Sequence, residues 1–328
     1  MSMQKSPHFP PARVLGERIE RAWSSANRSL ASFKEIAAIA IADTDLSLFA
    51  TSEVAHWVAG LERSLPQLNP GIPFGDPAVT VWYGDGFVID LYYWNQYASG
   101  VHDHKFSGAF TVIEGLTVEY RYGFEVTEAV TDRVLVGKLY ETERQLLGPG
   151  EISLITAGSS LIHHPGHLEL PTVTLCVRTI NEQEIDLQYT YFSPGLALAI
   201  SQVEQAGHRL SFMSALRHRP AACIAYLERL IETTSLVVGV QAILNYASEH
   251  RDLAGCRQLI ERVPSSSAAL RQMIHDVVSE CCDEAYTRAA DGDTSVDALL
   301  SDLALHPDGS DIVRHLTGFL MGAPSSTS

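Results

Sequence analysis

Between residues 78 and 194 the sequence is a succession of short segments rich in valine, isoleucine, threonine and tyrosine, separated by turns that contain glycine. The segments AVTVWY and FVIDLYYW flank a GDG turn, and FTVIEG, LTVEYRYGFEV, EISLITAG and TVTLCVRTI continue the pattern. This composition favours strands, and no helical periodicity interrupts it. Many short strands without intervening helices predict an antiparallel sandwich or barrel.

The regions on either side of these strands have helical patterns. Residues 12–64 carry apolar side chains at helical spacing, and a break rich in proline and glycine follows over 66–75. Further helical segments begin after Pro194. We therefore predict three regions: an N-terminal helical segment over 1–75, a β-barrel over 76–194, and a C-terminal α-helical domain over 195–328.

Composition restricts the environment and the partners. The 328 residues carry a formal net charge of -16, and no apolar run approaches the length that spans a bilayer. A net negative chain is unfavourable for nucleic acid and for anionic membranes, which both require a basic face. The five cysteines have no CxxC spacing, and the N-terminus lacks the apolar segment of a signal peptide. We expect a soluble cytoplasmic protein that binds neither nucleic acid nor membrane.

The sequence His-Asp-His at residues 102–104 points to chemistry. Side chains two positions apart on a strand point to the same face. His102 and His104 would therefore present two imidazoles together, held by a strand rather than by a flexible loop. Such a pair is suited to binding a metal ion.

A third ligand is expected from the histidine cluster later in the β-rich region. The segment LIHHPGH contains His163, His164 and His167. We select His163, and His164 and His167 remain alternatives because neighbouring residues on a strand face opposite sides. Three neutral imidazoles suit Fe(II), zinc, nickel or copper, and the ligand type alone does not choose among them.

The spacing around the first two histidines resembles the cupin superfamily. Its first motif is written G(X)5HXH(X)3-4E(X)6G. Here the HxH pair is followed by three residues, by Gly108 at the glutamate position, and by Gly115 six residues later. The resemblance implies a double-stranded β-helix barrel that holds a metal in its interior.

The second cupin motif, G(X)5PXG(X)2H(X)3N, is matched at its opening. Gly150, Thr156 in place of the proline, and Gly158 keep the spacing. The motif histidine would fall at Leu161, two residues before His163. The segment HDHKFSGAF is also similar to one found in uncharacterised bacterial cupins, and that likeness favours His163 as the ligand.

Three histidines without the motif glutamate are similar to the thiol dioxygenase branch, which includes cysteine dioxygenase. The resemblance covers roughly residues 80–180, and it implies an Fe(II) centre and oxygen-dependent chemistry. That branch also has an arginine upstream of HxH, whereas no arginine lies between Arg63 and Arg121 here. Its Ser-x-His-x-Tyr run is replaced by TLCVR at 174–178. We therefore do not expect an amino-acid thiol as substrate.

Arg178, Tyr93 and His167 are the candidate catalytic residues. Arg178 shares a strand face with Cys176, so it could lie inside the barrel as a cation for a substrate anion. Tyr93 could donate a hydrogen bond inside the barrel, and His167 is expected to be a second inward histidine. Cys176 itself is interpreted as core filling.

Other polar residues of the strand segments are weaker candidates. Arg121 is a second possible cation. Glu119 and Glu125 could add a carboxylate ligand, but we interpret them as solvated strand positions.

We therefore predict a non-haem, Fe(II)-dependent dioxygenase that acts on a small organic substrate with O2. One alternative is a non-redox cupin isomerase or lyase, in which the metal acts only as a Lewis acid. Another is a non-catalytic binding or regulatory cupin, whose helical tail contacts a partner. Cupins often pair through their sheets, so a homodimer is also expected.

Overall fold

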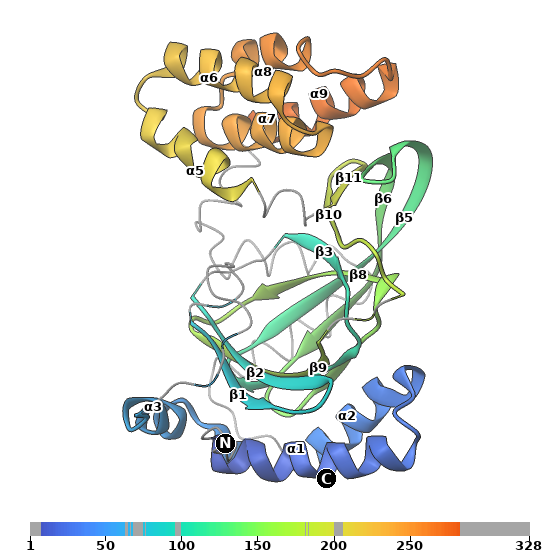
Figure 1. Cartoon of the computed structure of the whole chain (residues 1–328), viewed down its shortest axis with the longest axis vertical. Coiled ribbons are helices and arrows are strands. Elements are labelled where there is room, and N and C mark those ends of the chain that lie inside the picture. The colour runs from blue at the N-terminus through green and yellow to red at the C-terminus, as the bar shows by residue number, and fades with distance from the viewer. Residues whose placement is uncertain are drawn as a thin grey trace, which may run out of the picture.

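A computed structural model describes residues 8–62, 65, 67, 75, 77–95, 100–180, 182, 184–199 and 206–282. N-terminal helices lie against one side of a β-barrel, and a group of C-terminal helices lies at its other end (Figure 1). The predicted architecture, a β-barrel flanked by helices on both sides, is confirmed.

The N-terminal helices are α1 (Pro10–Ser25), α2 (Phe33–Ala42) and α3 (Thr51–Ala59), with short 3-10 turns at Leu30–Ser32 and Leu46–Phe49. Helix α1 opens with two prolines, where the missing N–H has no intrahelical partner to lose. In Figure 1, α1 and α2 run beneath the strands of one sheet. Their buried face, which includes Leu15, Ile19, Trp23 and Phe33, packs against apolar side chains of that sheet.

The barrel is built from eleven described strands in two sheets. They are β1 (Ala78–Tyr83), β2 (Phe87–Trp94), β3 (Val101–His104), β4 (Gly108–Glu114), β5 (Thr117–Thr131), β6 (Val134–Leu147), β7 (Ile152–Ile155), β8 (Gly158–His167), β9 (Thr172–Thr179), β10 (Tyr189–Phe192) and β11 (Leu196–Ala199).

The strand order identifies the topology. One sheet has the order β1-β2-β9-β4-β7, and the other has the order β10-β11-β6-β5-β8-β3. Side chains of β2, β4, β7 and β9 share an interior cluster with side chains of β6 and β8, so the two sheets pack face to face. The hydrogen-bonded strand pairs among them are antiparallel. This is the double-sheet jelly roll. The second sheet also closes on itself, because β10 pairs with both β3 and β11.

Strand β9 shows how the first sheet is buried on both faces. All of its residues are buried. Val173, Leu175 and Val177 join the cluster with the N-terminal helices, whereas Cys176 joins a cluster to which both sheets contribute. Alternate side chains therefore face the helices and the barrel interior, as strand geometry requires.

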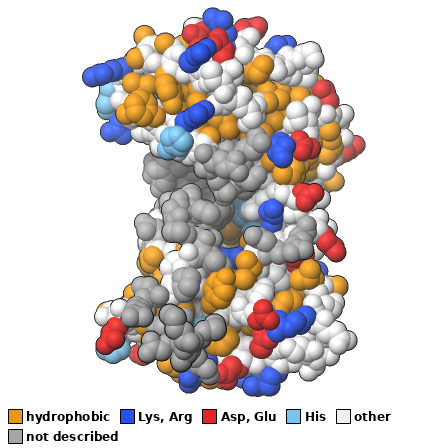
Figure 2. Space-filling model, in the orientation of Figure 1, with side chains coloured by type: hydrophobic (Ala, Val, Ile, Leu, Met, Phe, Trp, Pro, Cys, Tyr) orange, Lys and Arg blue, Asp and Glu red, His pale blue; other side chains and the backbone are white. Residues whose placement is uncertain are grey.

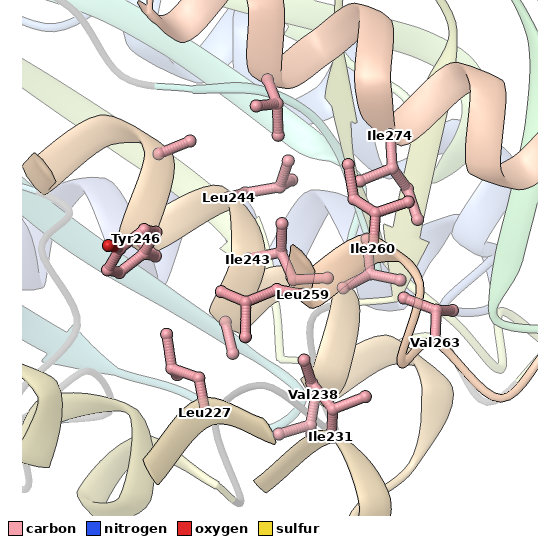
Figure 3. Close-up of a cluster of buried hydrophobic side chains, with 14 of the residues drawn as sticks. Leu227, Ile231, Val238, Ile243, Leu244, Tyr246, Leu259, Ile260, Val263 and Ile274 are labelled. Atoms are coloured by element: carbon pink, nitrogen blue, oxygen red, sulfur yellow. The ribbon is translucent and has the colours of Figure 1, made fainter. Parts of the chain in front are cut away.

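The C-terminal helices are α5 (Gly207–Leu216), α6 (Pro220–Thr233), α7 (Leu236–His250), α8 (Leu253–Ile260) and α9 (Ala268–Cys282). Their shared core includes Leu227, Ile243, Tyr246 and Leu259 (Figure 3). Val136 of β6, together with Leu196 and Leu198 of β11, belongs to the same cluster. The helices are therefore packed onto barrel strands rather than tethered by a linker alone.

The predicted division after residue 194 falls between two paired strands, since β11 pairs with β10 and β6. Helices expected beyond residue 282 lie outside the described residues. None of the described helices has the length and apolar character to span a bilayer. Figure 2 shows acidic and basic side chains interspersed over the helices and the barrel.

Candidate metal centre

Three histidines meet inside the barrel. His102 and His104 come from β3, and His163 comes from the neighbouring strand β8, where it lies opposite His102. All three side chains are buried, and one ligand nitrogen from each lies within 4.8 Å of the others. The structure thus brings together the three residues that the sequence suggested as ligands.

Alternation along β8 determines which histidine joins the pair on β3. Leu161 packs in the interior cluster between the sheets, and His163 and His167 share its face. Ile162 packs against the other face of the sheet, and His164 stacks edge-on with Tyr120 there. The structure therefore brings His163 to the metal centre, and it brings neither His164 nor His167.

Hydrogen bonds set the tautomers of two of the rings. Nδ1 of His102 lies 2.7 Å from the carbonyl oxygen of Gly100. Nδ1 of His163 lies 2.6 Å from Oε1 of Glu119. A carbonyl and a carboxylate accept hydrogen bonds, so each Nδ1 carries the proton and each Nε2 keeps its lone pair for a metal.

The spacing of two of these nitrogens fits the coordination of one divalent ion. Nε2 of His104 and Nε2 of His163 are 2.8 Å apart. Two nitrogens that each bind one ion at about 2.1 Å lie roughly 3 Å apart when the angle between them is near 90°. The spacing and the donor set therefore suit a first-row divalent metal.

The protonation state also fits metal binding. Burial, and then the neighbouring His163, lower the pKa of His102 to about 3. Burial and the two other histidines hold the pKa of His104 well below its ordinary value. Both rings are therefore neutral at pH 7, which is the form that coordinates a metal.

Glu119 supports this centre from β5. Its side chain is 0% exposed, and Oε2 accepts hydrogen bonds from Arg121 at 3.0 Å and from Ser153 at 2.8 Å. Burial acts to raise the pKa of Glu119, but His163, Arg121 and Ser153 together hold it below its ordinary value. The prediction that Glu119 is a solvated strand position is therefore wrong, whereas Glu125 is exposed as predicted.

The error has a structural cause. Val118 and Tyr120 alternate with Glu119 and form an outer cluster with Leu116 and Leu168. An antiparallel strand usually turns its apolar face inward. Here β5 turns its polar face into the barrel. The polar residues of β5 recur at every second position, as the histidines of β3 and β8 do. This shared period was the signal in the sequence.

Aromatic rings and one ion pair lie beside the histidines. The ring of Phe106 lies 4.5 Å from that of His104, and the ring of Phe110 lies 6.3 Å from that of His163. Arg178 is buried, its guanidinium lies 4.9 Å from the centre of Phe106, and its Nε donates to Asp90 at 2.9 Å. Arg178 therefore lies inside the barrel as expected, with its charge balanced by Asp90.

Gly108 occupies the position at which the cupin motif has glutamate. It lies opposite Arg178 in the pairing of β4 with β9. A Cβ atom at this position would lie 2.0 Å from the carbonyl oxygen of Val177. The close approach of the two strands leaves no room for a side chain, so this position cannot supply a carboxylate ligand.

Tyr93 does not face the centre. Its side chain belongs to the cluster between β2 and the N-terminal helices, together with Ile89 and Leu91. Burial, and then Glu114, raise its pKa to about 12. The prediction that Tyr93 lies inside the barrel is wrong, because alternate residues of β2 face the helices.

The side chain of His167 points into the barrel, but it lies far from the three histidines of the metal centre. Its ring stacks on Trp94 with centroids 4.6 Å apart, and Nδ1 lies 3.0 Å from the hydroxyl of Thr117. Four residues along a strand separate it from His163 by about 13 Å. The structure therefore places His167 towards another end of the barrel interior.

Comparisons with known proteins give matches only among solved structures. No protein-family model and no curated protein matches the chain. The DMSP lyase DddQ from Ruegeria pomeroyi DSS-3 is 13% identical over 32% of this chain and 43% of its own, with a TM-score of 0.23. The chain thus spans less than half of that protein.

Two further solved structures are similar in part. Hydroquinone 1,2-dioxygenase from Sphingomonas sp. TTNP3 is 15% identical over 33% of this chain and 68% of its own, with a TM-score of 0.26. A cupin-2 domain containing protein from Shewanella frigidimarina NCIMB 400 is 13% identical over 33% of this chain and 82% of its own, with a TM-score of 0.21.

The fold is a cupin-type barrel, and its strand order carries that conclusion independently of these scores. Its interior holds a site of three histidines suited to a metal ion. The likeness to the thiol dioxygenase branch remains a prediction, as does the identity of the metal.

Proposed function

We propose that this protein is an Fe(II)-dependent dioxygenase that acts on a small organic substrate. The observation that carries the proposal is the ligand set: three buried imidazoles that converge without a carboxylate among them. Three protein ligands leave coordination positions open. When bound, Fe(II) would supply the electron-transfer chemistry that couples an organic substrate to O2.

The charges around the histidines favour an anionic substrate. Glu119 is paired with Arg121, and Asp90 is paired with Arg178. In each pair the two charges balance, and imidazole ligands carry no negative charge. The charge of a divalent ion would therefore not be neutralised by its protein ligands. A substrate that binds as an anion, such as a carboxylate or an ionised phenol, would supply the missing negative charge.

The aromatic rings and the ion pair beside the histidines would orient such a substrate. Asp90 fixes the guanidinium of Arg178 by a hydrogen bond to Nε, and the guanidinium lies over the ring of Phe106. We assign Arg178 the role of orienting the substrate anion. Phe106 and Phe110 would exclude water beside the histidines and contact the apolar part of the substrate. Tyr93 faces the helices, and we assign it no role in the reaction.

The test is anaerobic loading with Fe(II), followed by exposure to nitric oxide. We expect about one iron per chain and the electron paramagnetic resonance signal of nitric oxide at a non-haem Fe(II) site. His102→Ala should abolish the signal. The matched control is His164→Ala, which removes the neighbour of a ligand on the opposite face of β8 and should keep it.

Oxygen uptake then tests the chemistry. A panel of small carboxylic acids and phenols, each paired with its amide or methyl ether, should contain an anion that stimulates O2 consumption. Zinc or nickel bound in place of iron, with no O2 uptake by any member, would overturn the proposal and assign non-redox isomerase or lyase chemistry. Failure to bind any of these metals would overturn the metal centre itself.

A further inference from the structure

Asp103 lies between two candidate ligands and faces away from them. Its side chain is 1% exposed. Oδ1 accepts a hydrogen bond from the main-chain nitrogen of Tyr189 at 2.7 Å, and Oδ2 accepts one from the hydroxyl of Tyr191 at 2.8 Å. Both partners belong to β10, so the carboxylate joins the histidine-bearing strand to its outer neighbour.

Strand β3 is short, and the register of its pairing with β8 is irregular. It has four residues, and β10 pairs with it at Thr190 opposite His102 and at Tyr191 opposite Val101. On its other side the register with β8 shifts between His102 and His104. A short strand with an irregular register is weakly fixed by its ladder. The two hydrogen bonds of Asp103 therefore add side-chain attachments to the segment that carries both histidines.

The partner strand β10 is itself firmly attached. Tyr191 is buried, and its ring lies 5.1 Å from that of Phe124 of β5. Strand β10 also pairs with β11 along its full length. Leu196 and Leu198 of β11 belong to the hydrophobic core of the C-terminal helices. A continuous series of packed elements thus runs from those helices through β11 and β10 to Asp103.

We propose that Asp103 is a positioning residue for the metal centre: it clamps the strand of His102 and His104 to β10, and through β11 to the C-terminal helices. The clamp acts on the backbone, and it does not touch the metal or the rings. Loss of the clamp would let β3 shift, and the two imidazoles would no longer converge with His163. The C-terminal helices thereby gain a role in metal binding.

The test compares two tyrosines on the same strand. Tyr191→Phe removes a hydroxyl that donates to Asp103. Tyr189→Phe removes a hydroxyl that donates to the carbonyl of Asp132, and it keeps the main-chain nitrogen that Asp103 uses. The probe is Co(II), whose affinity and visible absorption bands report the number and geometry of the ligands.

We expect Tyr191→Phe to weaken Co(II) binding by about 10-fold, in the lower part of the range for residues that orient metal ligands, and to shift the absorption bands. Tyr189→Phe should bind Co(II) as the unmodified protein does. Asp103→Ala should lose more affinity than Tyr191→Phe. Asp103→Asn should restore most of it, because the amide oxygen can accept from the main-chain N–H while the amide nitrogen donates to Tyr191.

Equal Co(II) affinity in Tyr191→Phe and Tyr189→Phe would overturn the proposal. Circular dichroism and thermal unfolding of the metal-free variants show whether Tyr191→Phe is folded, so a loss of affinity in a folded variant supports positioning. The inference rests on the metal centre but not on iron or O2. A failure of the oxygenase proposal would therefore leave this result unaffected.

Discussion

Nδ1 of His163 donates a 2.6 Å hydrogen bond to Glu119, which is itself completely buried. The carboxylate fixes the ring orientation and increases the electron density on Nε2, the nitrogen that is available to a metal. Arg121 and Ser153 hold the carboxylate in turn. Three side chains outside the histidine site therefore hold one of its three imidazoles in place.

Replacement of this carboxylate should reduce metal affinity. We expect Glu119→Ala to weaken Zn(II) binding by about 10- to 100-fold, and Glu119→Gln to weaken it less, because its amide oxygen still accepts from Nδ1. Competition with a chelating dye measures the change. The control is Glu143→Gln, which removes the exposed partner of Arg121. An equal loss in Glu143→Gln would show that general surface charge causes the effect.

Gly108 should tolerate no side chain. A methyl group there would meet the carbonyl oxygen of Val177, so Gly108→Ala forces two central strands apart. We expect a loss of at least about 2 kcal/mol in the free energy of unfolding, measured by urea denaturation. Gly207→Ala is the control, since no atom lies within 4 Å of the added methyl. Gly108→Glu, which recreates the cupin motif, should fail to fold.

Replacement of one partner of the buried ion pair should destabilise the protein more than replacement of both. Arg178→Met leaves the charge of Asp90 buried with Thr80 and Tyr92 as its remaining partners. We expect this change to cost about 3–5 kcal/mol. The double variant Asp90→Asn with Arg178→Met should recover part of the loss in urea denaturation. A double variant less stable than Arg178→Met alone would contradict this expectation.

His167 should make stability depend on pH. Burial, and then His164, lower its pKa to about 3, so the folded state keeps the ring neutral. The unfolded chain takes up a proton near the ordinary histidine pKa of about 6.5. The free energy of unfolding should therefore be highest above about pH 6.5, and it should fall as the pH is lowered towards about 3.

Urea denaturation of the metal-free protein at pH 7 and pH 5 measures this effect. His167→Asn should lose less stability between the two pH values than the unmodified protein. The buried ligands His102 and His104 contribute equally to both proteins, so the difference isolates His167. The same loss of stability in both proteins would mean that folding does not lower the pKa of His167.

The barrel and the first two histidines of the site could be predicted from the sequence because their signals are local. Glycine turns and period-two alternation define strands, and His102 and His104 share a face by strand geometry alone. The third ligand could not be assigned in this way. The choice among the three later histidines depends on the phase of β8, which its pairing with β3 sets.

The two errors concern which face of a strand points inward. Tyr93 and Glu119 both lie on well-predicted strands, and in each case the opposite face was expected. Strand β2 is covered by helices outside and by the opposing sheet inside, so both of its faces are buried. Strand β5 packs apolar residues on its outer face. Hydrophobicity cannot identify the interior when both faces are covered.

The closure of the second sheet has a consequence for association between chains. Strand β3, which would otherwise end that sheet, is covered by β10, and β10 continues into β11 and β6. Among the strands described here, unpaired sheet edges remain only at β1 and β7, both in the first sheet. A second chain that extends a sheet by strand addition would therefore have to approach β1 or β7, and the histidine-bearing strand is protected from such pairing.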